Sequence, residues 1–197
     1  MEAFQTLDAV MLPLAQANVD TDQILPARYL QKPRSAEFDE FLFRDLRYRK
    51  DGSENPEFVL NHPAYRVARV IVAGDNFACG SSREHAVWAL YDYGFRAAIA
   101  PSFGDIFFAN ALKNGLLPIV LPADAVAALL AAARAIPGAQ VAVDLAAQTV
   151  TAPAGAVYPF SIDQFSRHCL LEGLDEIDYT LSQSAHIAAY EEALDKR

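Results

Sequence analysis

Six consecutive residues in the middle of the chain, Gly80-Ser81-Ser82-Arg83-Glu84-His85, combine hydroxyl, guanidinium and carboxylate groups. Arg83 offers a planar donor that binds a carboxylate or phosphate through two parallel hydrogen bonds. A helix is predicted to begin here, and the unpaired backbone N–H groups of a helix start also stabilise an anion. A hydroxyl in that field loses its proton more readily, so Ser81 and Ser82 are candidate bases or nucleophiles.

The same residues also fit a purely structural role. Ser81 and Glu84 have the spacing of a capping box, S-x-x-E, in which Ser81 caps the helix and Arg83 is a solvated surface charge. The spacing alone gives the two interpretations equal weight. A serine hydrolase would show G-x-S-x-G, and the run lacks the second glycine, so acyl transfer is disfavoured.

Two other polar segments lie in the N-terminal third of the chain. The turn Asn18-Val-Asp-Thr-Asp22 carries paired carboxylates that can bind a metal or orient a catalytic group, although acidic turns more often act only as caps. Five arginines follow it, namely Arg28, Arg34, Arg44, Arg47 and Arg49. In an acidic protein they suggest carboxylate recognition or a partner surface, with a solvated charged loop as the alternative.

The cysteines argue against a metal cluster held by this chain alone. Cys79 and Cys169 lie 90 residues apart, with no C-x-x-C spacing, and are expected to be reduced thiols. An iron–sulfur cluster needs about three or four cysteine ligands. No metal site is therefore expected in this chain.

The elements around the serine–arginine run are expected to alternate between strand and helix. Residues 67–73 are nearly all β-branched or apolar, which is typical of a strand buried on both faces, and the following helix should end at Gly94. Further strands are expected at 9–14, 97–100 and 116–121, helices at 103–114 and 124–135, and a β-ribbon at 140–145 and 148–152. This pattern predicts an α/β fold.

One domain is expected to span residues 1–197. Residues 32–61 carry prolines, glycine and many charges without a steady period, which predicts a long, flexible N-terminal loop. Ser161-Ile-Asp-Gln164 is a second capping box, and helices are expected over 162–194.

Composition limits the classes of partner. Of 197 residues, 53% are hydrophobic, so the chain should fold, and 16 basic against 25 acidic residues give a net charge of −9 that disfavours nucleic acid. The longest apolar run is too short to cross a membrane. The first cation is Arg28, so no basic leader is expected and the predicted location is the cytoplasm.

Three separated motifs bring a family resemblance into view. They are Asn18-Val-Asp-Thr-Asp-Gln-Ile-Leu-Pro26, Asn76-Phe-Ala-Cys-Gly-Ser-Ser-Arg-Glu-His85 and Ala100-Pro-Ser-Phe-Gly-Asp-Ile-Phe-Phe-Ala-Asn110. Together they resemble the small subunits of bacterial 3-isopropylmalate dehydratase, of the aconitase superfamily. The match extends, in family order, to Arg167-His-Cys-Leu-Leu-Glu-Gly-Leu-Asp175.

The resemblance implies a swivelling β/β/α domain, like the C-terminal domain of aconitase, that closes over a separate large subunit carrying a 4Fe-4S cluster. The implied activity is that of a hydro-lyase in leucine biosynthesis, active only with its large subunit. It would isomerise 2-isopropylmalate and 3-isopropylmalate, which are hydroxy-dicarboxylates, by dehydration and rehydration.

The resemblance also implies roles for individual residues. Ser81 would be the catalytic base and Arg83 its partner, with Asp22 a further member of the active site. The substrate would be bound by Ser82, Arg83 and Thr21 together with an arginine of the following loop, for which Arg34 is the best match and Arg28 a weaker one.

Two departures from the family pattern leave alternatives open. Ala78 stands where the family usually has glycine, and Arg34-Ser-Ala-Glu-Phe38 stands where Arg-Thr-Gly-Phe-Gly is common. The second lies in the loop expected to contact the variable group of the substrate. The alternatives are a sister hydratase acting on citraconate or another small dicarboxylate, and a non-catalytic anion-binding regulatory module.

Overall fold

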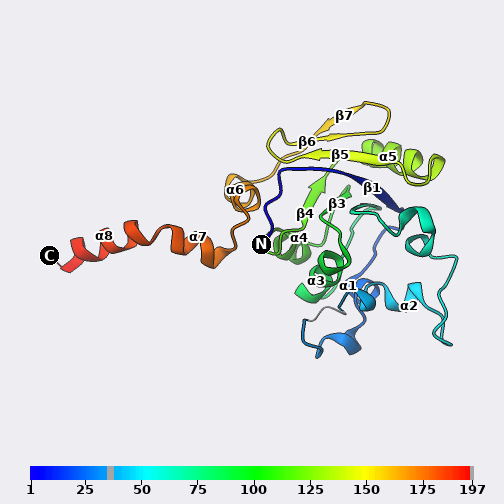
Figure 1. Cartoon of the computed structure of the whole chain (residues 1–197), viewed down its shortest axis with the longest axis horizontal. Helices are drawn as coiled ribbons and strands as arrows, with labels where there is room; N and C mark the ends of the chain where they lie inside the picture. The colour runs from blue at the N-terminus through cyan, green and yellow to red at the C-terminus, as the bar shows by residue number, and fades with distance from the viewer. Residues whose placement is uncertain (35–37, 196–197) are drawn as a thin grey trace.

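The computed structural model describes residues 1–34 and 38–195, and in this part of the chain seven strands form one curled sheet (Figure 1). Their spatial order is β4-β3-β2-β1-β5-β6-β7. The strands are β1 (Thr6–Leu14), β2 (Val70–Ala73), β3 (Ala97–Ala100), β4 (Leu117–Val120), β5 (Gln140–Asp144), β6 (Thr149–Thr151) and β7 (Val157–Pro159). Strands β1 to β4 run parallel, whereas β5 to β7 pair antiparallel, so β1 joins the two halves.

The described α-helices are α1 (Thr21–Ile24), α2 (Arg44–Arg47), α3 (Glu84–Tyr93), α4 (Asp105–Lys113), α5 (Ala123–Ala135), α6 (Gln164–Glu172), α7 (Glu176–Ser182) and α8 (Ser184–Asp195). Four 3₁₀ turns accompany them, at Ala27–Tyr29, Phe38–Phe41, Val59–Asn61 and Pro63–Tyr65. The expected alternation of strands and helices between residues 67 and 152 is confirmed, with ends that differ by a few residues. Strand β7 is an addition that the sequence pattern did not predict.

Each face of the sheet carries its own apolar core. Successive side chains of a strand point to opposite faces, so Ile71 and Ala73 pack with α3 and α4, whereas Val70 and Val72 pack with α5. All four residues of β2 are fully buried. The expectation of a strand buried on both faces is thus confirmed, and β2 is a rigid base for the residues that follow it.

Both predicted capping boxes are wrong, because other contacts compete for the same residues. The cap of α3 is Arg83, not Ser81, and it makes no side-chain capping bond. Glu84 instead accepts a hydrogen bond of 2.8 Å from the amide of Asn114. At α6 the cap is Asp163, not Ser161, and its carboxylate accepts from the Ser166 N–H at 2.9 Å.

The N-terminal segment expected to be flexible is packed against the protein over residues 38–61. Phe38, Leu42 and Phe43 are fully buried. Asn61 is also buried, and its amide donates to the Arg47 carbonyl oxygen at 2.6 Å. A flexible loop is therefore not shown for residues 38–61. Residues 35–37 of the same segment lie outside the described residues.

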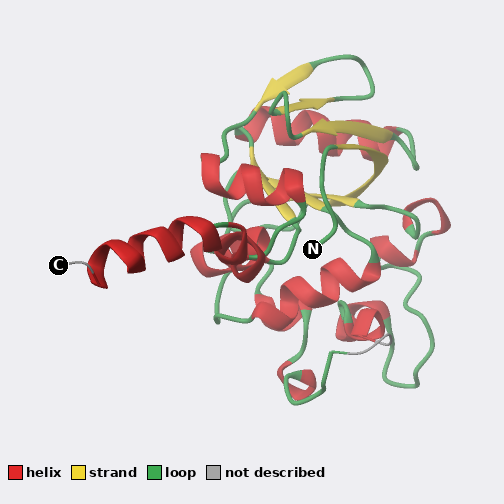
Figure 2. Ribbon diagram, turned by 60° about the vertical axis from the view of Figure 1, so that its left-hand side comes forward, coloured by secondary structure: helices red, strands yellow, loops and turns green. Residues whose placement is uncertain are grey.

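Helix α8 projects from the body of the molecule, and α7 leads to it (Figures 1 and 2). Ile177, Leu181 and Tyr190 on these helices are 70%, 64% and 67% exposed. The helices expected over residues 162–194 are thus present, as α6, α7 and α8. Within the described residues, no helix is both long enough and apolar enough to span a bilayer.

Replacing Phe38 by alanine tests whether residues 38–61 belong to the core. Loss of a fully buried phenyl ring should lower the free energy of unfolding by about 3–5 kcal/mol. Val67→Ala is the matched control, because Val67 is 69% exposed and its truncation should change stability by no more than about 0.5 kcal/mol. Urea unfolding of both variants measures the free energy of unfolding. Equally small decreases for the two variants would contradict the packing of residues 38–61 in the core.

Candidate active site

The serine–arginine run lies at the carboxyl ends of the parallel strands. Strand β2 ends at Ala73 and leads into residues 74–83, whereas β3 ends at Ala100 and leads into residues 101–104. The two segments are joined by backbone hydrogen bonds from Phe77 to Ser102 and from Gly104 to Phe77, each 3.0 Å long. In open α/β sheets, ligands bind beyond the carboxyl ends of the strands, so this is the edge where a site is expected.

The short helix α1 brings the acidic turn to the serine loop. Asp20 caps α1 by accepting the Gln23 N–H at 2.7 Å, and the Gln23 side chain completes the capping box. The next residue, Thr21, is only 2% exposed. Its N–H donates to the Cys79 carbonyl oxygen at 3.0 Å, and its hydroxyl donates to the Ser81 carbonyl oxygen at 2.9 Å. Thr21 therefore fixes the backbone that carries Ser81.

An ion pair between Arg83 and Asp22 closes the junction. One guanidinium nitrogen of Arg83 donates to a carboxylate oxygen of Asp22. The Arg83 side chain is 15% exposed, so it is largely held by the protein, whereas that of Asp22 is 53% exposed. Ser81 and Ser82 are both exposed. Two exposed serines therefore directly precede, along the chain, an arginine whose guanidinium is oriented by Asp22, and these groups suit a ligand carboxylate and a proton transfer.

The loop before Ser81 has an irregular backbone held by specific contacts. Asn76 and Ala78 adopt left-handed conformations with φ of 55° and 57°. The Asn76 amide donates to the Asn18 side chain at 2.8 Å, and the Asn76 N–H donates to the Ser102 hydroxyl at 2.9 Å. Left-handed backbone suits asparagine and strains alanine, so Ala78, where the family usually has glycine, is held there by its surroundings.

Gly104 supports the same loop through close backbone packing. A Cβ atom at this position would lie 2.5 Å from the Ala78 carbonyl oxygen, which leaves no space for a side chain. Neither Gly104 nor Ser102 was predicted from the sequence to have a role in the site. Both belong to the Pro-Ser-Phe-Gly stretch of the third motif, and the glycine there was the signal that could have marked a close approach.

The two candidate loop arginines lie elsewhere in this structure. Arg34 pairs with Asp92 of α3, with 3.0 Å between Nε and Oδ2, and its guanidinium lies 5.6 Å from the centre of the Trp88 ring. The hydrogen bonds to Asp92 raise the pKa of Arg34. Arg28 forms a bidentate pair with Asp45, which lowers the pKa of that carboxyl. Among the described residues, neither arginine has a hydrogen bond or ion pair with Ser81, Ser82 or Arg83.

The described residues do not gather a set of metal ligands. In residues 1–34 and 38–195, no three histidine, cysteine or acidic side chains gather closely enough to hold a metal ion. Both cysteines are free thiols, Cys79 half-buried and Cys169 buried, and burial raises the pKa of Cys169.

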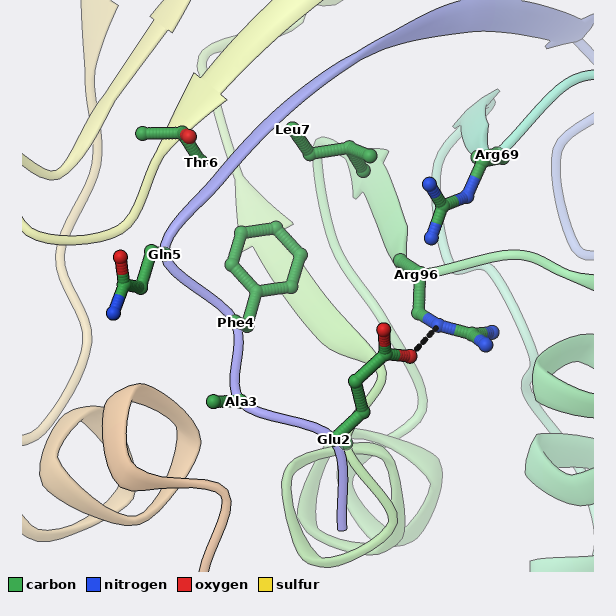
Figure 3. Close-up of a pocket in the computed structure, with 9 residues that line it drawn as sticks. Glu2, Ala3, Phe4, Gln5, Thr6, Leu7, Arg69 and Arg96 are labelled. Carbon is green, nitrogen blue, oxygen red and sulfur yellow. Dashed lines mark hydrogen bonds and ion pairs between the residues drawn. The ribbon is translucent and has the colours of Figure 1, made fainter.

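A hollow of about 150 Å³ lies at the opposite end of the parallel strands from the serine loop (Figure 3). Arg69 and Arg96, which directly precede β2 and β3, line it together with Glu2 and Phe4. The Glu2 carboxylate accepts from Arg96 Nε at 3.3 Å (Figure 3). This hollow is separated from the serine loop by the length of the strands and contains none of the residues predicted for the site.

Two family models and several curated relatives match this chain. A model of the aconitase C-terminal domain family matches residues 1–124, and a model described as LeuD_N matches residues 127–164. A curated relative from Rhodospirillum centenum, named "3-isopropylmalate dehydratase small subunit", is 53% identical over 191 residues, covering 97% of this chain and 94% of the relative. A relative of the same name from Methylobacterium radiotolerans is 51% identical over 197 residues, covering 100% and 98%.

A solved structure shares the fold. The crystal structure of 3-isopropylmalate dehydratase (leuD) from Methanocaldococcus jannaschii superposes with a TM-score of 0.68 at 26% identity. The alignment covers 94% of this chain and 99% of that one. The swivel-type fold expected from the three motifs is therefore confirmed.

Thr21→Val tests the link between α1 and the serine loop. Valine keeps the shape of threonine but cannot donate to the Ser81 carbonyl oxygen, so the free energy of unfolding should fall by about 1 kcal/mol. Thr180→Val is the control, because the Thr180 hydroxyl bonds only within exposed helix α7. Urea unfolding compares the two variants, and an unchanged midpoint for Thr21→Val would show that the hydrogen bond contributes nothing.

Proposed function

The chain belongs to the family of 3-isopropylmalate dehydratase small subunits, and from this premise we propose that it forms the small subunit of a two-chain hydro-lyase. The enzyme interconverts 2-isopropylmalate and 3-isopropylmalate by dehydration and rehydration, a step of leucine biosynthesis. The observation that carries the proposal is the exposed Ser81 beside Arg83, held at the carboxyl ends of the parallel strands by Thr21 and Asp22.

Ser81 acts as the base. Its deprotonated hydroxyl takes a proton from a carbon next to a substrate carboxylate, and the electron pair of that C–H bond forms the double bond as the hydroxyl group leaves the neighbouring carbon as hydroxide. The 4Fe-4S cluster assigned to the large subunit would supply the Lewis acid that accepts this hydroxide. Water then adds to the alkene with the opposite orientation, and Ser81 returns its proton. A nearby guanidinium favours the charged form of the base, which is the role of Arg83.

The surrounding residues divide into binding and positioning roles. Ser82 is exposed and binds a substrate carboxylate together with Arg83. Asp22 orients the Arg83 guanidinium through their ion pair. Thr21, expected among the substrate-binding residues, is buried, and its hydroxyl donates a hydrogen bond to the Ser81 carbonyl oxygen. These contacts support a positioning role for Thr21.

The arginines of the following loop would meet the substrate when the second chain closes the site. Arg34 lies along α3, the helix that Arg83 caps, and Arg28 follows α1 by a few residues. Each is paired with an aspartate here, Arg28 with Asp45 and Arg34 with Asp92, so each would have to leave that pair to reach the substrate. Residues 35–37, where the sequence departs from the family pattern, lie outside the described residues.

The remaining parts of the proposal concern the partner. The family name implies a large subunit. The chain has only two cysteines, and its described residues hold no group of metal ligands, so we assign the 4Fe-4S cluster to that subunit. The metabolic role of the relatives supports a cytoplasmic location. A small hydroxy-dicarboxylate is the substrate.

Ser81→Ala tests the proposed base. In the two-chain enzyme assayed anaerobically on 3-isopropylmalate, kcat should fall by about 10²- to 10⁴-fold, because positioned proton transfer contributes that much to rate. Binding to the large subunit should be unchanged, since the Ser81 side chain makes no hydrogen bond with the described residues. Ser161→Ala, at an exposed serine outside the site, should keep full activity.

Near-normal turnover by Ser81→Ala in an assembled enzyme would overturn the assignment of the base. The same preparation tests the substrate, since citraconate, an unsaturated dicarboxylate, is the substrate of the alternative sister hydratase. Faster turnover on citraconate than on isopropylmalate would assign the chain to a sister hydratase.

Arg34→Ala tests the role of the loop arginine. Loss of a guanidinium that binds a substrate carboxylate should raise KM by about 10- to 100-fold, the equivalent of one charged hydrogen bond, with a smaller change in kcat. Arg66→Ala is the control, because Arg66 forms a comparably exposed pair with Glu54 outside the site. An unchanged KM for Arg34→Ala would remove Arg34 from the substrate-binding set.

A further inference from the structure

A hollow of about 500 Å³ in the N-terminal segment has an unusual concentration of cations. We call it the basic hollow, and its lining consists of Arg28, Arg44, Asp45, Tyr48, Arg49, Lys50 and Gly52. Four of these seven residues are cationic and one is acidic. No role in the proposed reaction uses Arg44, Arg49 or Lys50.

The hollow contrasts with the charge of the whole chain. Residues 28–50 contain seven of the 16 lysines and arginines and only four acidic residues, in a protein whose net charge is −9. A local excess of positive charge attracts anionic groups. The basic hollow is therefore a place where an anionic partner is selected.

Two of the arginines are held in place before any partner arrives. The Arg44 guanidinium stacks on the Tyr48 ring at 4.0 Å, and Arg28 is fixed by Asp45 and lies 4.7 Å from the centre of the Tyr29 ring. Ordered arginine and tyrosine side chains lose little entropy on binding, and they are enriched at the energetic centres of protein interfaces.

The other two cations are free to accept a partner. Arg49 and Lys50 are both exposed, and their side chains form no hydrogen bond or ion pair with the described residues. The hollow thus has fixed arginines stacked on tyrosines and two unpaired cations at its border. An exposed surface of this composition fits the carboxylates of a protein partner better than an enclosed small molecule.

The basic hollow also adjoins the face that a second chain must cover. Helix α2, which carries Arg44, is anchored to α1 by the Phe43 N–H, which donates to the Ile24 carbonyl oxygen at 2.7 Å. Helix α1 begins with Thr21 and Asp22, whose contacts hold Ser81 and Arg83. A partner chain that covers the exposed Ser81 would therefore also contact the neighbouring basic hollow.

We propose that the basic hollow docks a carboxylate-rich surface segment of the large subunit and so orients the two chains before the site closes. This inference rests on the proposed function only in taking the large subunit as the partner. Charge pairs at the edge of an interface act mainly on the association rate and its salt dependence, so assembly should weaken as ionic strength rises.

The double variant Arg49→Glu/Lys50→Glu tests the proposal by titration with the purified large subunit at several NaCl concentrations. At low salt, the dissociation constant should rise by about 10- to 100-fold and should depend much less on NaCl than in the wild type. At saturating large subunit, kcat and KM should be unchanged, because neither residue belongs to the proposed site. Thermal unfolding of the isolated variant checks that it remains folded.

Arg69→Glu/Arg134→Glu is the matched control, since it makes the same change of net charge at two exposed arginines outside the basic hollow. Its dissociation constant should stay within about threefold of the wild-type value. Equal dissociation constants of the two double variants for the large subunit would overturn the proposal. So would unchanged assembly with a raised KM, which would make the hollow a substrate site. An assembled but inactive wild-type complex would refute the proposed function instead, leaving the docking result intact.

Discussion

Two hydrogen bonds donated by Thr21 hold the candidate site together. Its N–H bonds the Cys79 carbonyl oxygen and its hydroxyl bonds the Ser81 carbonyl oxygen, so a loop after β2 is fixed by a residue about 60 positions earlier in the chain. The Asp22–Arg83 ion pair then orients the guanidinium. Without these contacts, the backbone that carries the exposed Ser81 would not be held in one conformation. A catalytic base must be positioned against its substrate to act.

The parts of the fold that the sequence predicted well share one physical property. Residues 67–152 alternate between short apolar strands and helices that end at glycine or proline. The apolar runs and the helix-ending residues are local features of the sequence, so the order of strands and helices could be predicted from them. The two capping-box predictions were wrong because a side chain caps a helix only if no other hydrogen-bond partner competes for it. Glu84 has the correct spacing for Ser81 but lies beside Asn114, and Asp163 is a closer cap for α6 than Ser161. Tertiary contacts decided both cases.

The candidate site was only partly accessible to sequence reasoning. The types and spacing of Ser81, Ser82 and Arg83 indicated an anion site, and the motifs grouped them with Thr21 and Asp22. The aspartates that pair with Arg28 and Arg34 could not be predicted, because Asp45 and Asp92 carry no local signal of those contacts. The same limit applies to residues 38–61, whose buried phenylalanines are spaced without a regular period and so resembled a solvated loop.

Strand β1 has a consequence for the order in which the protein folds. It pairs with β2, about 60 residues later, and with β5, about 130 residues later. The hydrogen bonds along its two edges can therefore form only at different stages of synthesis. During synthesis, the parallel half can assemble once β2 to β4 have been made, whereas the other edge of β1 stays open until β5 emerges. Contacts so distant in sequence form slowly. The nascent chain therefore exposes an unpaired strand edge for much of its synthesis, and this is the interval in which it is most vulnerable to aggregation.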